Sequence, residues 1–170
     1  MKINARCIAH CLAKVTLMLV IIACAGVGPA VERLPISVAV WDLEDLSPVP
    51  HGQTGIGDFL ATRIIARIGE IPAYQSVERQ ELIKVIEELH LGSSDLADGQ
   101  TRLRLGRVIG AQQMVFGAFQ VAGSTLRLDL RRIDVSSGKV LKTGTGLAVA
   151  DNISGWLTAA DVAAAELVAP

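Results

Sequence analysis

Hydrophobic positions along the middle of the chain follow two different periods. Residues Pro35 to Leu43 form a short run rich in β-branched side chains, which is typical of a strand buried on both faces. After a loop rich in Gly and Pro, hydrophobic residues recur every three or four positions and predict a helix that ends near Gly69 and Pro72. Its buried face is expected to consist of Ile56, Phe59, Leu60, Ile64 and Ile68.

A second strand and two further helices are predicted next. The strand covers residues 73–77, and a helix covers residues 78–91. That helix is expected to bury Leu82, Ile83, Ile86 and Leu89. A third helix should begin at Asp98, whose carboxylate suits a helix N-cap, and run through Leu103 to Val108.

Three glycines punctuate the segment around residues 106–117. Gly110 falls where the third helix should end, a position that favours a left-handed backbone. Gly106 inside the helix indicates close packing, and Gly117 inside the following strand indicates a bulge or a near neighbour. Phosphate-binding loops run from strand to glycines to helix, so the order here predicts no such loop.

The last part of the chain reads as an antiparallel meander followed by a helix. Leu126, Leu128 and Leu130 alternate with charged residues, and residues 122–124 and 136–138 form short turns on either side. The pair Arg131–Arg132 shifts the alternation, so that Ile133 and Val135 are expected to rejoin the core through a bulge. The next strand should present Leu141, Leu147 and Val149 to the core, and residues 154–168 should form the final helix.

These elements predict one α/β domain over residues 35–170. We expect a single, three-layer-like arrangement with a mixed sheet, a C-terminal antiparallel meander and a final helix.

The N-terminus has the pattern of a signal peptide, which we place at residues 1–30. Lys2, Arg6 and Lys14 precede an uncharged apolar run from Val15 to Gly28, which is shorter than the roughly 20 residues of a stable bilayer span. Ile21 to Cys24 are similar to a lipobox, so lipidation at Cys24 is the expected processing. Cleavage near Ala30, and an uncleaved membrane anchor, are the alternatives.

Charge and cysteine content narrow the function. Cys7, Cys11 and Cys24 all lie in the leader, which leaves the domain without a thiol for a disulfide, a zinc site or catalysis. Three of the 16 basic residues and none of the 17 acidic ones precede Cys24, so the remaining chain has a net charge of −4. We therefore expect no nucleic-acid binding, and interpret Arg102–Arg107 and Arg131–Arg132 as solvated surfaces.

Few residues suggest a catalytic, nucleotide-binding or metal-binding site. The glycines of HGQTGIGD, residues 51–58, match neither a dinucleotide fingerprint nor a P-loop, so neither nucleotide nor other cofactor is expected. Asp42, Glu44 and Asp45 follow the first strand, where carboxylates could hold a hard cation. A solvated strand exit with one acid capping a turn is the preferred interpretation. An enzyme would need a site around these acids and His51, and we predict no catalytic or metal-binding residue.

Four segments, residues 38–48, 75–89, 105–120 and 131–140, resemble in order and spacing the signature segments of the CsgG-like family. The family includes curli secretion proteins, FlgO, PelC, the N-terminal domain of TolB and penicillin-binding-protein activator lipoproteins. The resemblance implies an α/β domain that assembles, often into rings, at the outer membrane. In the curli channel, long hairpins inserted at two places of this domain build the pore. Here residues 122–124 and the segment after Val149 leave no room for them.

The resemblance implies a non-enzymatic envelope protein. We expect a lipid-anchored accessory or ring-forming scaffold in the periplasm or at the outer membrane, acting in secretion or envelope assembly without forming a pore. Its partners would be envelope or secretion proteins and further copies of the chain. The alternative is a monomeric module that activates a cell-wall synthase.

Overall fold

A computed structural model describes residues 34–48, 55–92, 96, 98–149 and 153–169. The predicted leader, with Cys24 and Ala30, lies outside the described residues, and so does His51. The elements in chain order are β1 (Ile36–Val40), β2 (Glu44–Asp45), α2 (Ile56–Gly69), β3 (Tyr74–Ser76), α3 (Arg79–Glu88), α5 (Gly99–Val108), β4 (Gln113–Ala122), β5 (Thr125–Asp134), β6 (Val140–Val149) and α6 (Ile153–Val168).

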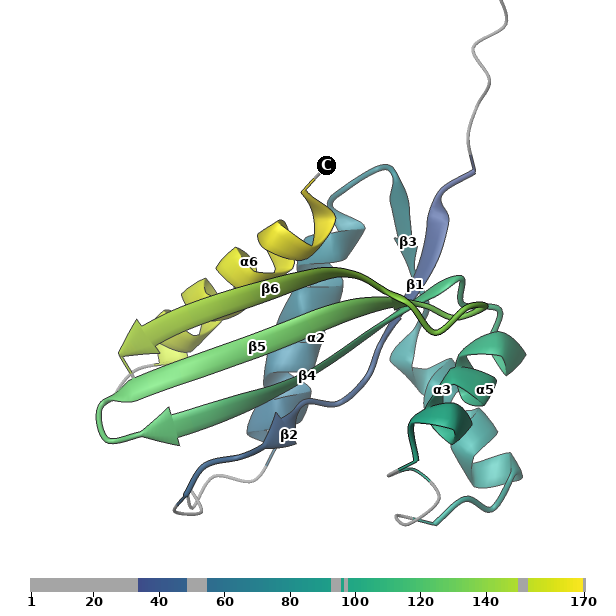
Figure 1. The fold of residues 1–170 in the computed structure, drawn as a ribbon, viewed down its shortest axis with the longest axis horizontal. Helices are drawn as coiled ribbons and strands as arrows, with labels where there is room; N and C mark the ends of the chain where they lie inside the picture. Colours follow the sequence, from purple (N-terminus) through teal and green to yellow (C-terminus); the bar gives the residue numbers. More distant parts are fainter. Residues whose placement is uncertain (1–33, 49–54, 93–95, 97, 150–152, 170) are drawn as a thin grey trace, which may run out of the picture. The chain divides into compact units, whose positions relative to one another are not determined.

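The strands form one mixed sheet in the order β3-β1-β4-β5-β6 (Figure 1). β1 runs parallel to both β3 and β4, and the short β2 also lies parallel to β4. β4, β5 and β6 are antiparallel neighbours, and only Gly123 and Ser124 separate the paired residues Ala122 and Thr125. The predicted mixed sheet, terminal meander and short turn are confirmed.

Helices α2 and α6 cover one face of the sheet and enclose the larger core. Leu60, Ile64 and Ile68 of α2 are fully or almost fully buried there, as the helical period predicted. Phe59 is an exception, because 41% of its surface remains exposed. Burial of this core, which contains 20 residues, is the main stabilising contribution to the fold.

The contact between α6 and β6 corrects the predicted orientation of β6. Leu147 and Val149 are 65% and 59% exposed, and Leu141 is also exposed, although all three were expected to face the core. Gly144 and Gly146 face the core instead. A Cβ atom on either glycine would overlap a backbone carbonyl of α6, at Ala163 and Ala159 respectively. Small residues on both elements therefore let the helix lie directly against the strand.

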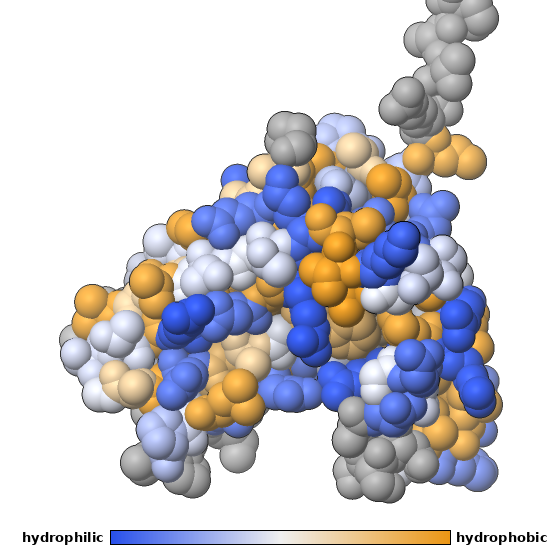
Figure 2. Space-filling model, viewed as in Figure 1, coloured by the Kyte–Doolittle hydropathy of each residue, from blue (hydrophilic) through white to orange (hydrophobic). Residues whose placement is uncertain are grey.

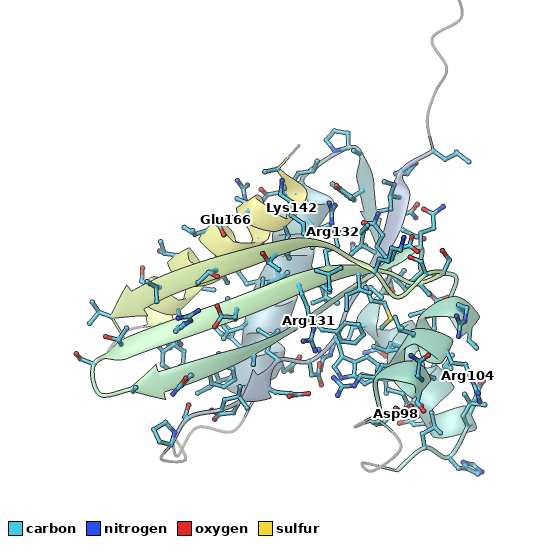
Figure 3. The ribbon with its side chains drawn as sticks, viewed as in Figure 1. Asp98, Arg104, Arg131, Arg132, Lys142 and Glu166 are labelled. Atoms are coloured by element: carbon cyan, nitrogen blue, oxygen red, sulfur yellow. The ribbon has the colours of Figure 1, made fainter. Side chains whose placement is uncertain are left out.

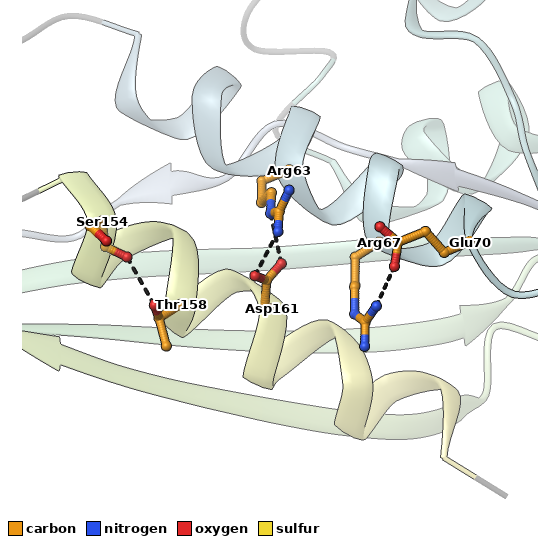
Figure 4. Close-up of polar contacts among 6 residues, drawn as sticks. All are labelled: Arg63, Arg67, Glu70, Ser154, Thr158 and Asp161. Carbon is orange, nitrogen blue, oxygen red and sulfur yellow. Dashed lines mark hydrogen bonds and ion pairs between the residues drawn. The ribbon is translucent and has the colours of Figure 1, made fainter.

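An ion pair joins the two helices of this layer (Figure 4). Arg63 of α2 donates two hydrogen bonds of 2.7 Å each to the two carboxylate oxygens of Asp161 in α6. The same close-up shows Arg67 paired with Glu70, and the Thr158 hydroxyl donating to the Ser154 carbonyl oxygen at 2.9 Å. The bidentate pair fixes the relative position of α2 and α6 at the surface of the core.

In the described part of the chain, α3 and α5 cover one end of the other face of the sheet. A second hydrophobic cluster lies beneath them and consists of Ala39, Ala111, Met114, Phe116 and Val135. α3 contributes little to it, because Leu82 is buried while Ile83 and Leu89 are 40% and 49% exposed. The four-residue buried face predicted for this helix is therefore wrong. This third layer covers part of the sheet, and no other described residue forms a helix over the rest of β4, β5 and β6 on this side.

The irregularity predicted near Arg131 and Arg132 exists, but its consequence differs. The pairing of β5 with β6 shifts between Arg132 and Ile133. Ile133 and Val135 pack in the second cluster, on the opposite face from Leu126, Leu128 and Leu130. Arg132 itself continues the inward alternation and is only 9% exposed. It lies 5.2 Å from the centre of the Tyr74 ring and donates a hydrogen bond to the Tyr74 hydroxyl. Arg132 is thus not a solvated residue.

The boundaries of α5 agree with the sequence prediction. The Asp98 carboxylate accepts hydrogen bonds from the Thr101 amide at 2.8 Å and the Thr101 hydroxyl at 3.0 Å, and these bonds lower the pKa of Asp98. Gly110 follows the helix with a φ of 70°. A Cβ on Gly106 would overlap the Met114 sulfur, which confirms close packing. At Gly117 the near neighbours are Leu130 and the Asp129 carbonyl, so this glycine marks a close approach.

In the part of the chain that the structure describes, no helix is long and apolar enough to cross a bilayer.

Candidate interaction surface

The three acids after β1 do not converge on one site. Asp42 is paired with Arg79, which also contacts Asp58 at 3.0 Å. Glu44 pairs with Arg102 at 3.1 Å, and Asp45 accepts a hydrogen bond of 2.8 Å from the Ser47 amide. Each carboxylate therefore has its own partner. One acid of the three was expected to cap a turn, and the structure shows that it is Asp45. Among the described residues, no three His, Cys, Asp or Glu side chains form a group suited to a metal ion.

Gly57 has a packing role at the start of α2. A Cβ atom at this position would overlap the Leu43 carbonyl oxygen, so the absence of a side chain lets the helix approach the segment after β1. Gly55, at the N-cap of α2, has a φ of 89°, and a Cβ on it would meet nothing within 4 Å. These two glycines of the HGQTGIGD segment are therefore explained by backbone geometry and packing.

Arg102 of α5 is the centre of a cluster that joins α5 to β2, to β4 and to the segment that follows β1. Its guanidinium carbon lies 6.0 Å from the centre of the Trp41 ring and 5.6 Å from that of Phe116. The two rings are 6.2 Å apart, and the Glu44 ion pair adds β2 to the cluster. Only 13% of the Arg102 side chain is exposed. The expectation that Arg102 is a solvated surface residue is therefore wrong, because the aromatic faces attract the cation.

A cleft of about 490 Å³ opens beside this cluster on the uncovered face of the sheet. It extends from α5 and β2 across β4 and β5 to β6. Its lining includes Glu44, Arg102, Phe116, Asp129, Arg131 and Thr143. Figure 2 is viewed toward this face and shows hydrophilic and hydrophobic side chains interspersed on it.

The charges along the cleft differ in how they are satisfied. Asp129 accepts hydrogen bonds of 2.7 and 3.0 Å from Arg127 and one of 3.1 Å from the Thr145 hydroxyl. These bonds, the Arg127 one first, lower the pKa of Asp129. Arg131 is exposed, and it forms no ion pair with any residue that the structure describes. Figure 3 shows it extending from β5 toward the side of the sheet where α3 and α5 lie. The acids of the cleft are already paired, whereas Arg131 is not, so Arg131 is suited to contact with an acidic group of another molecule.

Sequence reasoning missed this cluster, although a signal was present. The helical period places Arg102 on the same face of α5 as Leu105 and Gly106, which are both buried. A basic residue on a buried helical face indicates a specific partner. Neither Trp41 nor Phe116 is close to Arg102 in sequence, so the identity of that partner required the fold.

The fold is shared with several bacterial proteins. The LpoB C-terminal domain from Salmonella enterica superposes with a TM-score of 0.55 at 15% identity, covering 79% of this chain and 93% of LpoB. The Escherichia coli LpoB domain gives 0.57 at 12% identity, over 76% and 93% of the two chains. Lipoprotein GNA1162 from Neisseria meningitidis gives 0.54 at 19% identity, over 68% and 81%. No curated protein matches the sequence.

The sequence pattern of the family named after the curli production assembly/transport component CsgG matches residues 32–121. This match runs from before β1 into β4, and it includes Trp41, Glu44, Arg102 and Phe116. It spans more than half of the 170 residues, and the resemblance of the four signature segments agrees with it. The chain therefore belongs to the CsgG family.

Proposed function

We propose that the protein is exported, anchored by a lipid at Cys24, and acts in the periplasm at the outer membrane as a non-enzymatic accessory or ring-forming scaffold. The observation that carries this proposal is membership of a family whose namesake is an assembly/transport component. The role would be in secretion or envelope assembly, through protein contacts and with no cofactor. The two-residue turn at Gly123 and Ser124, where the pore-forming relative has an insertion, supports a role without a pore.

The anchor is supported by the sequence and by one related fold. Cys24 follows Ile21, Ile22 and Ala23 at the end of a basic and then apolar leader. GNA1162, which shares the fold, is described as a lipoprotein.

The cleft beside Arg102 supports a role in binding. Glu44 and Asp129 are already paired, which leaves Arg131 as the cation available to a partner. Thr143 adds a hydroxyl group that can donate or accept a hydrogen bond. A partner with an exposed carboxylate, either another copy of the chain or a second envelope protein, would fit this surface.

Site-specific photocrosslinking in cells tests the proposal. A photoreactive residue replaces Leu46, an exposed residue of the cleft lining, so that Arg131 stays in place. A matched variant carries the photoreactive residue at Arg104, an exposed arginine on α5 outside the cleft lining. Adducts identified by mass spectrometry should form from position 46 and involve a second copy or an envelope protein. Equal adducts from both positions, or none from position 46, would contradict the proposal. An adduct with a cell-wall synthase, from a protein that is otherwise monomeric, would favour the activator alternative.

A further inference from the structure

We propose that the free edge of β6 is a docking site for an extended segment of another protein, which joins the sheet as an additional strand. β6 is ten residues long and terminates the sheet in the described part of the chain. The outer side of such a strand carries main-chain N–H and C=O groups with no neighbouring strand, and these groups can pair with an incoming backbone.

One hydrogen bond shows which main-chain amides of β6 face the outer edge of the sheet. The Thr145 amide donates a hydrogen bond of 2.8 Å to a carboxylate oxygen of Glu166 in α6, so it faces away from β5. Because main-chain direction alternates with a period of two, the amides of Thr143, Leu147 and Val149 face the same way. The Glu166 carboxylate therefore occupies the position that the carbonyl oxygen of an incoming strand would take.

The side chains along this edge are suited to further burial. Leu147 is 65% exposed and Val149 is 59% exposed, both on the uncovered face of the sheet. Val140 and Leu141 are exposed at the other end of β6, where the pairing with β5 is irregular. Monomeric proteins usually shorten or charge such an edge to prevent association. Hydrophobic residues at alternate positions of an incoming strand would cover Leu147 and Val149.

A second copy of this chain does not fit as the occupant. α6 lies directly over β6, because Cβ atoms on Gly144 and Gly146 would overlap its backbone. Paired strands lie about 4.8 Å apart, whereas packed helices need about 8–10 Å between their axes. Two β6 strands side by side would bring two α6 helices too close together. The occupant is therefore an extended segment that carries no helix on this face.

Glu166 determines the charge of that segment. A strand that binds the Thr145 amide displaces the Glu166 carboxylate from its hydrogen bond. A lysine or arginine on the α6 side of the incoming strand would pair with it. Lys142 lies on the same side near α6, but its ammonium group already donates to the Ala169 carbonyl oxygen at 3.1 Å, so Glu166 is the charged group that loses its partner when a strand binds (Figure 3). The fitting segment thus alternates hydrophobic and basic residues.

A model peptide tests this site on the full chain. The probe is a fluorescein-labelled peptide of nine residues in which lysine and valine alternate, and binding is followed by fluorescence anisotropy. Two controls carry N-methyl groups on all valine or all lysine amides, which blocks one edge of the peptide each. One of them should bind about tenfold more weakly than the parent, and the other should bind as the parent does. If the two N-methylated peptides bound equally well, binding would depend on charge and not on backbone pairing, and the proposal would be overturned.

A protein variant locates the peptide. Leu147→Pro removes an outward amide that β5 does not use, so the sheet should persist, and Leu147→Val is the matched control that keeps the amide. The proline variant should bind the peptide about tenfold more weakly than the valine variant. Hydrogen exchange of the unmodified protein is a second measurement that needs no variant. Peptide should slow exchange at Thr143, Leu147 and Val149, and unchanged exchange there would overturn the proposal.

Binding at the β6 edge can be tested separately from binding in the cleft beside Arg131. Peptide binding uses the β6 backbone, so Arg131→Gln should leave peptide affinity unchanged, and failure of the crosslinking experiment would not affect the docking proposal.

Sedimentation of the peptide-free protein tests whether the occupant is a second copy of the chain. Self-association that Leu147→Pro abolishes would overturn the assignment to a partner segment.

Discussion

Gly146 of β6 and Ala159 of α6 are in such close contact that no side chain fits between them. A Cβ atom on Gly146 would overlap the Ala159 carbonyl oxygen, its carbonyl carbon and its Cα atom. The obstacle is backbone, so it cannot move aside as the end of a flexible side chain would. The position of α6 on the sheet therefore depends on the absence of a single methyl group.

Gly146→Ala should destabilise the protein by about 1–3 kcal/mol, because α6 must shift away from its core contacts. Urea unfolding at equilibrium measures the change. Gly99→Ala is the control, since a Cβ atom there meets nothing within 4 Å and the residue begins α5. The control should leave the stability unchanged or raise it slightly. A Gly146→Ala protein as stable as the control would show that α6 is not held in this position.

The same contact explains why the orientation of β6 could not be predicted. The leucines and valines of KVLKTGTGLAVA suggest an inward face at Leu141, Leu147 and Val149. The glycines at 144 and 146 face inward instead, because a helix rich in alanine needs a surface without side chains. In β5 the alternation identified the inward face correctly, because Leu126, Leu128 and Leu130 alternate with charged residues along the strand. In β6 the hydrophobic residues lie on the uncovered face of the sheet, so the hydrophobic pattern alone predicted the wrong inward face.

Gly110→Val should cost about 1 kcal/mol or more of stability through its backbone alone. Gly110 has a φ of 70°, and a Cβ atom at this position would meet nothing within 4 Å, so the expected cost comes from the left-handed backbone and not from a clash of the Cβ atom. Gly110→Asn tolerates the left-handed region better and should cost less. Equilibrium unfolding of both variants tests this order. Equal stabilities of the two variants would contradict the explanation.

Asp134 makes the turn between β5 and β6 sensitive to acid. Its carboxylate accepts hydrogen bonds from the Ser136 hydroxyl at 2.6 Å and from the hydroxyl and amide of Ser137 at 2.7 and 2.8 Å. These bonds, the Ser136 one first, lower the pKa of Asp134 from 3.8 to about 2. A lowered pKa means that the turn is stabilised fully above about pH 4, and that this stabilisation is lost as the pH falls toward 2.

The carboxyl carbon of Asp134, followed by NMR, should therefore titrate near pH 2. The destabilisation caused by Asp134→Ala should be present at neutral pH and should disappear at the lower end of this range. Asp134→Asn keeps one acceptor oxygen without the charge, and its stability relative to the alanine variant should not depend on pH there. A titration near the ordinary value of an aspartate would show that the serines do not bind the carboxylate in solution.

The candidate site was less predictable than the fold. Asp98 as a helix cap, and a turn cap among Asp42, Glu44 and Asp45, were predicted from local sequence, and the structure has both. Arg102 depends on Trp41, which follows β1, and on Phe116 of β4. Arg132 depends in the same way on Tyr74. Local patterns identify side chains that serve their own segment, whereas a buried cation is explained only by residues that the tertiary structure brings to it.

Arg102→Met should destabilise the protein by about 0.5–2 kcal/mol. The substitution keeps most of the side-chain length but removes the charge that lies beside the Trp41 and Phe116 rings. Glu44→Gln removes only the exposed partner of the ion pair and should change the stability by less than about 0.5 kcal/mol. Urea unfolding of the two variants separates these contributions. If Glu44→Gln cost as much as Arg102→Met, the ion pair and not the aromatic contact would hold α5.

The last prediction concerns attachment to the membrane, on which the proposed location depends. Cys24 ends an apolar run in which Ile21, Ile22 and Ala23 precede it, and a lipid on that residue would hold the domain at a membrane without a spanning helix. Full-length protein expressed in a bacterium should incorporate a fatty-acid analogue and sediment with the membranes. Cys24→Ser should lose both properties, whereas Cys11→Ser, earlier in the same leader, should keep them. Mass spectrometry of the mature N-terminus provides an independent measurement. A chain that begins at Val31, or labelling that persists in Cys24→Ser, would show soluble export or another anchor, and the scaffold would then have to reach the outer membrane through its protein partners alone.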